Sequence, residues 1–116
     1  MKYNELSKWH KDILRYMLTK QHYFNEEIEK QLESASFDLL EDGISLGIKA
    51  VKTSEKLENL TVPIEVESYD IDGMDIHGLL FSRNGIIFYL EFYRDDGKKI
   101  VEIPKVDSFE IFSFGI

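Results

Sequence analysis

The stretch that decides the fold is "IEVESYDIDGMDIHGLLFSRNGIIFYLEFYRDDG", residues 64–97. Its aromatic and β-branched runs are separated by Asp72-Gly73, Asn84-Gly85 and Asp96-Gly97. Dipeptides of this kind suit two-residue type I′ turns, because both central residues of such a turn need positive φ. The stretch therefore predicts consecutive β-hairpins, with strands at about 62–71, 74–83, 86–94 and 99–104.

Two-residue turns also fix which residues lie opposite one another. Leu79 then lies opposite Val66 and Leu90, and the apolar positions of all four strands fall on one side of the sheet. This predicted core face consists of Val62, Ile64, Val66, Leu79, Phe81, Phe88, Leu90, Phe92, Val101 and Ile103. Because three separate turns agree on it, we expect this face to form the core.

The pattern of the first 35 residues predicts helices. Apolar side chains recur at helical spacing from Asn4 to about Lys20, and Asn25 is a suitable N-cap for a second helix. Residues 36–41 either end that helix or begin a hairpin around Asp42-Gly43. The alternation of apolar residues after Gly43 favours the hairpin.

Together these signals predict one domain over residues 1–116, with a helical part at 1–35 and β-hairpins at 36–116. The expected fold is α+β, with two N-terminal helices packed on one face of a mainly antiparallel meander sheet of about five to seven strands. A polar loop is expected at about 52–61. The sequence leaves open where the first hairpin joins the sheet, and whether the C-terminal tail adds a strand or wraps an edge.

Composition narrows the possible functions. The chain has no cysteine, so disulfides and thiolate metal sites are excluded, and no apolar window has the length of a signal peptide or a membrane span. Its formal charge is −8, although residues 1–24 carry a net charge of +3. An acidic body repels phosphate backbones, so we expect no nucleic-acid ligand and rather a basic protein partner. Since no apolar window is long enough to span a membrane, we also expect no membrane association. A cytoplasmic location fits these features.

Two stretches, "QLESASFDLLEDG" (31–43) and, within the stretch quoted first, "VESYDIDGMDIHGLLFSRNGIIFYLEFYRDD" (66–96), carry a family resemblance. They resemble a family of small bacterial proteins known only as a domain of unknown function, over roughly residues 30–95. The resemblance implies the same architecture and brings no established activity. The chain departs from the family at residues 44–47, where the family is rich in glycine, and at "KKIVEIPKVDSFEI" (98–111).

The sheet face opposite the predicted core supplies the candidate site. The predicted registers place Glu67, Gly78, Glu91 and Glu102 side by side, with Gly78 as an open spot between two carboxylates. Like charges opposite each other destabilise a sheet, so this row calls for an explanation. Aromatic residues flank it, and the candidate partner-binding face comprises Glu67, Tyr69, Gly78, Tyr89, Glu91, Tyr93 and Glu102.

Other constellations are alternatives to partner binding. Glu67, Glu91 and Glu102 could hold a divalent cation or take part in acid–base chemistry. Asp70 and Asp72 resemble part of a calcium loop, but we expect them to be hairpin residues that face water. His77 is expected on the core side, opposite Phe92. No catalytic residue is predicted, and no cofactor is expected, because the chain has neither a GxGxxG motif nor a P-loop.

The sequence therefore favours a small non-enzymatic protein that binds another protein, in the manner of an immunity protein or an antitoxin. Two alternatives remain at this point. One is a metal binder or enzyme that uses the glutamate row, and the other is a homodimeric accessory subunit with the same face buried against its copy.

Overall fold

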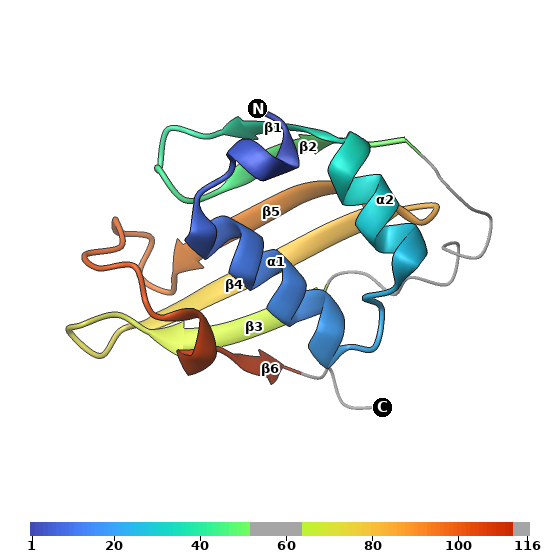
Figure 1. Ribbon diagram of the computed structural model, residues 1–116. Coiled ribbons are helices and arrows are strands. Elements are labelled where there is room, and N and C mark those ends of the chain that lie inside the picture. The colour runs from blue at the N-terminus through green and yellow to red at the C-terminus, as the bar shows by residue number, and fades with distance from the viewer. Residues whose placement is uncertain (52–63, 113–116) are drawn as a thin grey trace.

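The computed structural model describes residues 1–51 and 64–112 (Figure 1). The predicted loop at 52–61 and Val62 lie outside these residues. The elements, in chain order, are the 3-10 turn η1 (Tyr3–Glu5), helices α1 (Lys8–Lys20) and α2 (Glu26–Ser34), strands β1 (Ser36–Leu39), β2 (Leu46–Lys49), β3 (Ile64–Tyr69), β4 (Asp75–Arg83) and β5 (Ile86–Arg94), the 3-10 turn η3 (Val106–Ser108) and strand β6 (Glu110–Phe112). The predicted α+β fold is confirmed.

The strands form one antiparallel sheet in the order β1-β2-β5-β4-β3-β6. The predicted meander of β3, β4 and β5 lies at its centre. The first hairpin exists, so residues 36–39 are strand rather than helix, and it joins the sheet at β5, where Leu46 lies opposite Leu90. The C-terminal tail adds β6 along β3.

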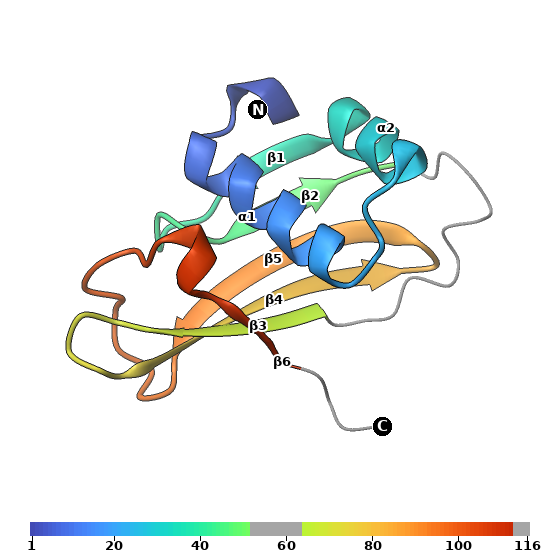
Figure 2. The ribbon, with the colours of Figure 1, turned by 60° about the horizontal axis from the view of Figure 1, so that its bottom comes forward.

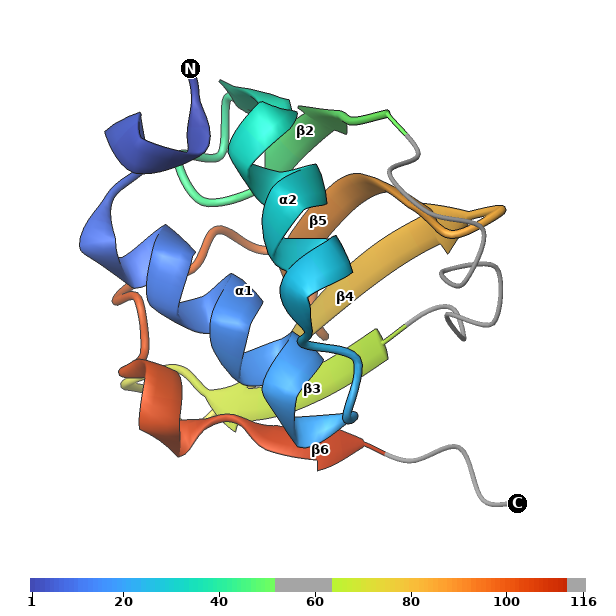
Figure 3. The same cartoon turned by 45° about the vertical axis from the view of Figure 1, so that its right-hand side comes forward.

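Both helices cover the same face of the sheet (Figures 2 and 3). Ser7 caps α1, because its Oγ accepts the His10 backbone N–H at 3.1 Å, and Asn25 caps α2 as predicted, accepting the Ile28 N–H at 3.0 Å. The apolar stripe of each helix is buried against the sheet, and includes Ile13, Leu14, Met17, Leu18, Ile28 and Leu32. None of the helices in the described residues is long and apolar enough to cross a membrane.

Gln31 joins α2 to the sheet through a buried polar side chain. Its Nε2 donates to the Gly85 carbonyl at 3.0 Å, and its Oε1 accepts the Ile87 N–H at 2.8 Å. Both of its polar ends are therefore satisfied inside the core, which is the usual condition for burying an amide. These two bonds position the second helix over the β4–β5 hairpin.

The predicted register of β4 is wrong by one residue. Val66 lies opposite Gly78, and Leu80 lies opposite Leu90. Since successive strand residues point to opposite faces, the shift turns the whole of β4 over. Ile76, Gly78 and Leu80 therefore face the core, while Leu79 and Phe81 do not.

Two irregularities, one at each end of β4, cause this shift. Five residues, Asp70 to Met74, separate the paired Tyr69 and Asp75, where a two-residue turn was predicted. Near the other end a β-bulge leaves Phe88 unpaired, because Phe81 lies opposite Tyr89 and Ser82 opposite Ile87. The two errors cancel for β5, so Leu90 and Phe92 lie in the core as predicted, together with Ile64 and Val66.

The chemistry of the turns explains the first irregularity. Only Asn84-Gly85 has positive φ at both residues, as a type I′ turn requires. In the Asp-Gly turns only the glycine has positive φ, and the aspartate accepts the N–H two residues further on, as Asp72 does from Met74 at 3.2 Å. Asp42 and Asp96 repeat this bond, so the Asp-Gly pairs close longer loops than the Asn-Gly pair does.

The predicted strand at 99–104 does not form. Val101 and Ile103 are exposed, whereas they were predicted to lie in the core, and Phe88 is 39% exposed. The N–H groups of Val101 and Glu102 donate to the carboxylate of Asp70, at 2.7 and 3.0 Å, instead of to a neighbouring strand. Phe109 fills this end of the core instead, with Trp9 and Phe92 around it.

Candidate functional site

One face of the central strands carries no covering element from the described part of the chain (Figure 2). We call this surface the open face and define it by the outward residues of β3, β4 and β5. Five of the predicted partner-binding residues lie on it as expected, because β3 and β5 have the predicted orientation: Glu67, Tyr69, Tyr89, Glu91 and Tyr93. Tyr69 is 69% exposed and Tyr93 39%. Their role in binding stays a prediction.

Gly78 does not lie on the open face. It points into the core, where a Cβ added to it would lie 2.5 Å from Phe92 Cε1 and 3.0 Å from Val66 Cγ2. The open spot predicted at this position is wrong, because the missing side chain makes room for the Phe92 ring. Gly78 therefore has a packing role.

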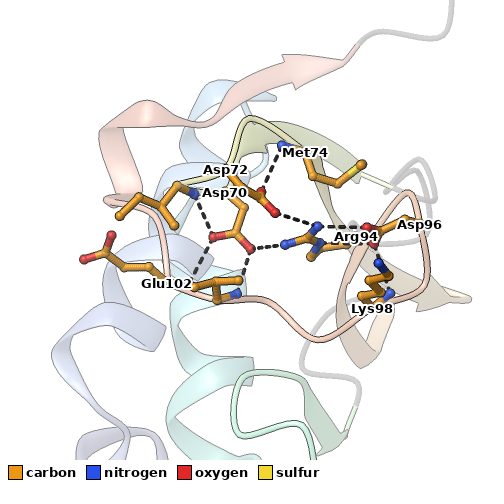
Figure 4. A network of polar contacts seen from close by, with 9 residues as sticks. Asp70, Asp72, Met74, Arg94, Asp96, Lys98 and Glu102 are labelled. Atoms are coloured by element: carbon orange, nitrogen blue, oxygen red, sulfur yellow. Dashed lines mark hydrogen bonds and ion pairs between the residues drawn. The ribbon is translucent and has the colours of Figure 1, made fainter.

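Glu102 also lies away from the open face. It belongs to the irregular segment after β5, and its backbone contacts Asp70 (Figure 4). The predicted row of Glu67, Glu91 and Glu102 is not assembled. In residues 1–51 and 64–112 no group of three or more histidine or acidic side chains has an arrangement that could hold a metal ion.

The shift of β4 brings His77 onto the open face, where it meets three carboxylates. Its Nε2 lies 2.5 Å from Asp95 Oδ1, and its Nδ1 lies 3.3 Å from Glu65 Oε1 and 3.8 Å from Glu67 Oε1. The Tyr93 ring stacks on the imidazole with centroids 5.0 Å apart. We call Glu65, Glu67, His77 and Asp95 the carboxylate cluster. The expected core position of His77 is therefore wrong.

Glu65 is the most buried member of the carboxylate cluster, with a side chain only 9% exposed. Its Oε2 and the Nδ1 of His77 are buried and have no hydrogen-bond partner within the described residues. A buried polar atom left without a partner costs about 1–3 kcal/mol. Within the described residues, these two atoms are therefore the unsatisfied buried polar atoms of the carboxylate cluster.

The electrostatic field at the carboxylate cluster is negative. Burial raises the pKa of the Tyr93 hydroxyl above its ordinary value. Four carboxylates raise it further, because each disfavours the phenolate; they belong to Glu65, Asp95, Glu91 and Glu67. A cation placed beside Tyr93 would be attracted by the same four groups.

The other end of the open face is apolar. The Phe81 ring stacks on Tyr89 with centroids 5.9 Å apart and lies 6.1 Å from Phe88. The Arg83 guanidinium lies over the Phe88 ring at 5.5 Å. We call Phe81, Phe88 and Tyr89, with Leu79, the aromatic patch. The open face thus joins an aromatic patch to a carboxylate cluster.

Asp70 and Arg94 form a second polar group, at the end of the sheet (Figure 4). Arg94 Nη1 lies 2.9 Å from Asp70 Oδ2, and Nη2 lies within 2.9 Å of both Asp72 and Asp96. The Asp70 and Arg94 side chains are almost completely buried, whereas we predicted that Asp70 would face water. The carboxylate oxygens of Asp70, Asp72 and Asp96 all accept hydrogen bonds or ion pairs from within the chain (Figure 4), so this group closes loops rather than presenting a site.

The pKa of Asp70 reflects these contacts. Burial alone would raise it, but the N–H groups of Val101, Glu102 and Ile71 and the Arg94 guanidinium stabilise the charged form and lower the pKa to about 2. Arg94 has a raised pKa for the matching reason, chiefly its bond to Asp96. Both groups are therefore charged at neutral pH.

Neither the cluster of Glu65, His77 and Asp95 nor the aromatic patch was predicted from the sequence. The signal was present in the turn residues. Another aspartate, Asp70, lies two residues before Asp72-Gly73. A longer loop capped by these aspartates, predicted in place of a two-residue turn, would have given β4 its observed orientation. The bulge at Phe88 has no comparable mark in the sequence.

The fold and the open face define a class: a two-layer α+β protein in which, among the described residues, helices cover one side of the sheet and not the other. The family model described as "Domain of unknown function (DUF6984)" matches residues 3–104. The chain belongs to this family, which confirms the expectation of a domain-of-unknown-function family. No curated protein and no solved structure matches the chain.

Proposed function

We propose that this protein acts by binding a basic protein partner on its open face, in the manner of an immunity protein or antitoxin that blocks an effector. One observation carries the proposal: an aromatic patch lies directly beside a carboxylate cluster on a sheet face that no helix of the described residues covers. The bacterial origin and the cytoplasmic location expected from the sequence belong to the same proposal.

The two parts of the open face would contribute differently to binding. Aromatic side chains dominate the energy of many interfaces, because they bury a large area at a low cost in side-chain entropy. The aromatic patch would supply this central contact. Carboxylates add selectivity and speed encounter with a basic surface, since opposite fields steer association. The whole chain, with a charge of −8, acts in the same direction.

The carboxylate cluster supports the proposal energetically. Glu65 Oε2 and His77 Nδ1 have no hydrogen-bond partner in the described chain, although both atoms are buried. Buried polar atoms without a partner in the described chain call for an explanation, and a functional surface is one such explanation. A lysine or arginine of the partner, placed beside Tyr93, would offset the charge of the cluster.

Self-association through the same face is the less favoured alternative. A two-fold dimer would bring each surface against its own copy. Such an interface would contain the carboxylates of Glu65, Glu67, Glu91 and Asp95 from both copies, and concentrating like charge in one interface is unfavourable. We therefore expect a monomer in sedimentation experiments at neutral pH, and a partner of opposite charge.

The test begins with the proteins encoded beside the gene for this chain. Each is purified and titrated calorimetrically against the chain. We expect a basic neighbour to bind, and the pair Glu67→Gln/Glu91→Gln to weaken binding about tenfold or more, which corresponds to about 1.4 kcal/mol.

The control pair Glu33→Gln/Glu102→Gln removes the same charge from exposed positions away from the open face. We expect it to change the affinity less than threefold at matched ionic strength, about 0.7 kcal/mol. Equal losses for the two pairs would show that only net charge matters. That result, or the absence of any binding neighbour, contradicts the proposal.

A further inference from the structure

A groove of about 740 Å³ runs along the outer side of α1, on the helical layer of the molecule. One wall is formed by α1 and the other by residues 105–107 at η3. Figures 2 and 3 show η3 beside α1, on the side of the sheet opposite the open face. The groove is therefore separate from the surface of the proposed function.

The floor of the groove is aromatic and held in place. Trp9 Nε1 donates to the Pro104 carbonyl at 2.8 Å, and the Tyr16 hydroxyl donates to the Phe109 carbonyl. The Trp9 ring also packs against Phe92, with centroids 5.2 Å apart. Since the polar atoms of both side chains are used internally, the rings contribute apolar surface to the groove. Such a preformed apolar floor is a common property of ligand sites.

The rim of the groove is basic. Its lining includes four cations, Lys8, Arg15, Lys20 and Lys105, against two carboxylates. Asp12 pairs with Lys8 at 2.6 Å. Within the described residues the other three cations form no ion pair with a carboxylate; Arg15 lies over the Phe24 ring and Lys20 over Tyr16. The groove lining is therefore net positive, although the chain as a whole has a charge of −8.

We propose that this groove binds an acidic peptide segment of another protein. An apolar side chain of the segment would pack on Trp9 and Tyr16, and its carboxylates would contact Arg15 and Lys105. Charge complementarity favours an anion, and the aromatic floor favours one with apolar side chains. A long nucleic acid fits less well, because it would extend past the groove onto an acidic body that repels phosphates.

The chain contains its own reporter for this site. Trp9 is the only tryptophan, so its fluorescence reports on the groove alone. The full chain is titrated with a panel of capped hexapeptides in which glutamates flank leucine and phenylalanine. We expect a saturable change that weakens as salt rises from about 0.05 to 0.5 M, because the Debye length shortens.

Variants then separate the groove from general charge. Arg15→Glu/Lys105→Glu should weaken binding at least tenfold. The matched pair Lys49→Glu/Lys99→Glu makes the same charge change outside the groove, and should alter affinity less than threefold. Circular dichroism confirms that each variant is folded. The Glu67→Gln/Glu91→Gln pair should leave this binding unchanged, so failure here is distinct from failure of the proposed function.

Three outcomes would overturn the inference. The first is a flat titration with every acidic peptide. The second is equal binding of peptides in which lysine replaces glutamate, which would remove the role of charge. The third is tighter binding of a twenty-nucleotide thymidine oligomer or of anionic lipid vesicles, which would assign the groove to a different class of ligand.

Discussion

At the scale of single residues, the Asp70 carboxylate holds together segments that are distant in sequence. It accepts bonds from its own turn, from Arg94 at the end of β5, and from the N–H groups of Val101 and Glu102. Its folded pKa of about 2 lies below the ordinary value of 3.8. The unfolded chain therefore takes up the proton more readily, so the contribution of Asp70 to stability is present above about pH 4 and is lost as the pH falls toward 2.

This linkage gives a pH prediction. In urea unfolding, we expect the free energy of unfolding of the native chain to fall between pH 4 and pH 2. Asp70→Asn should be less stable at pH 7, because Arg94 loses a charged partner, and its decline across the acidic window should be shallower. Parallel pH profiles for the two proteins would show that Asp70 does not control acid stability.

Gly78 gives a steric prediction. A methyl group at this position meets the Phe92 ring inside the core, so Gly78→Ala should lower the free energy of unfolding by about 1–3 kcal/mol. Gly47 is the matched control, since a Cβ there finds its nearest atom at 3.9 Å. Gly47→Ala should leave stability unchanged or raise it by up to about 1 kcal/mol. Equal effects in chemical denaturation would contradict the assigned register of β4.

At the scale of elements, Gln31 is the polar contact that fixes α2 on the sheet. Gln31→Leu leaves the Gly85 carbonyl and the Ile87 N–H buried without partners, so we expect a loss of about 2–4 kcal/mol in the free energy of unfolding. Lys30→Ala on the same helix removes only an exposed ion pair with Glu26 at 3.7 Å, and should cost less than about 0.5 kcal/mol. Should Gln31→Leu prove neutral in denaturant titrations, α2 must be held by apolar contacts alone.

A comparison of the predicted and observed helices and strands shows how far the sequence could predict the structure. The helices, the meander and the N-cap at Asn25 follow from periodicity and local chemistry. The orientation of β4 does not follow from them, because one extra residue in a loop, or one bulge, moves every side chain of a strand to the other face of the sheet. The same error affects the candidate site. The predicted positions of Glu67 on β3 and Tyr93 on β5 are correct. The predicted position of Gly78 is wrong and the carboxylate cluster was not predicted, because both depend on the orientation of β4. The absence of a strand at 99–104 depends on Asp70, a contact between residues more than thirty positions apart.

At the scale of the whole molecule, the two proposed binding surfaces have opposite charge and lie on opposite sides of the sheet. The open face is acidic and aromatic, and the groove along α1 is basic with an aromatic floor. Under the two proposals, the protein would contact two different chemical surfaces, one on each side of the sheet. Substitutions on one side should leave binding on the other side unchanged, since the two sites share no described side chain.

The most direct test of the central claim is a footprint of the complex with the basic neighbouring protein by NMR chemical-shift mapping. We predict that the changes concentrate on the outward residues of β3, β4 and β5, with Leu79, Phe81 and Tyr93 among the largest. Residues of α1 and α2 that face away from the sheet should be unaffected. A footprint centred on the helices, with the open face unchanged, would contradict the assignment of the open face as the partner-binding surface.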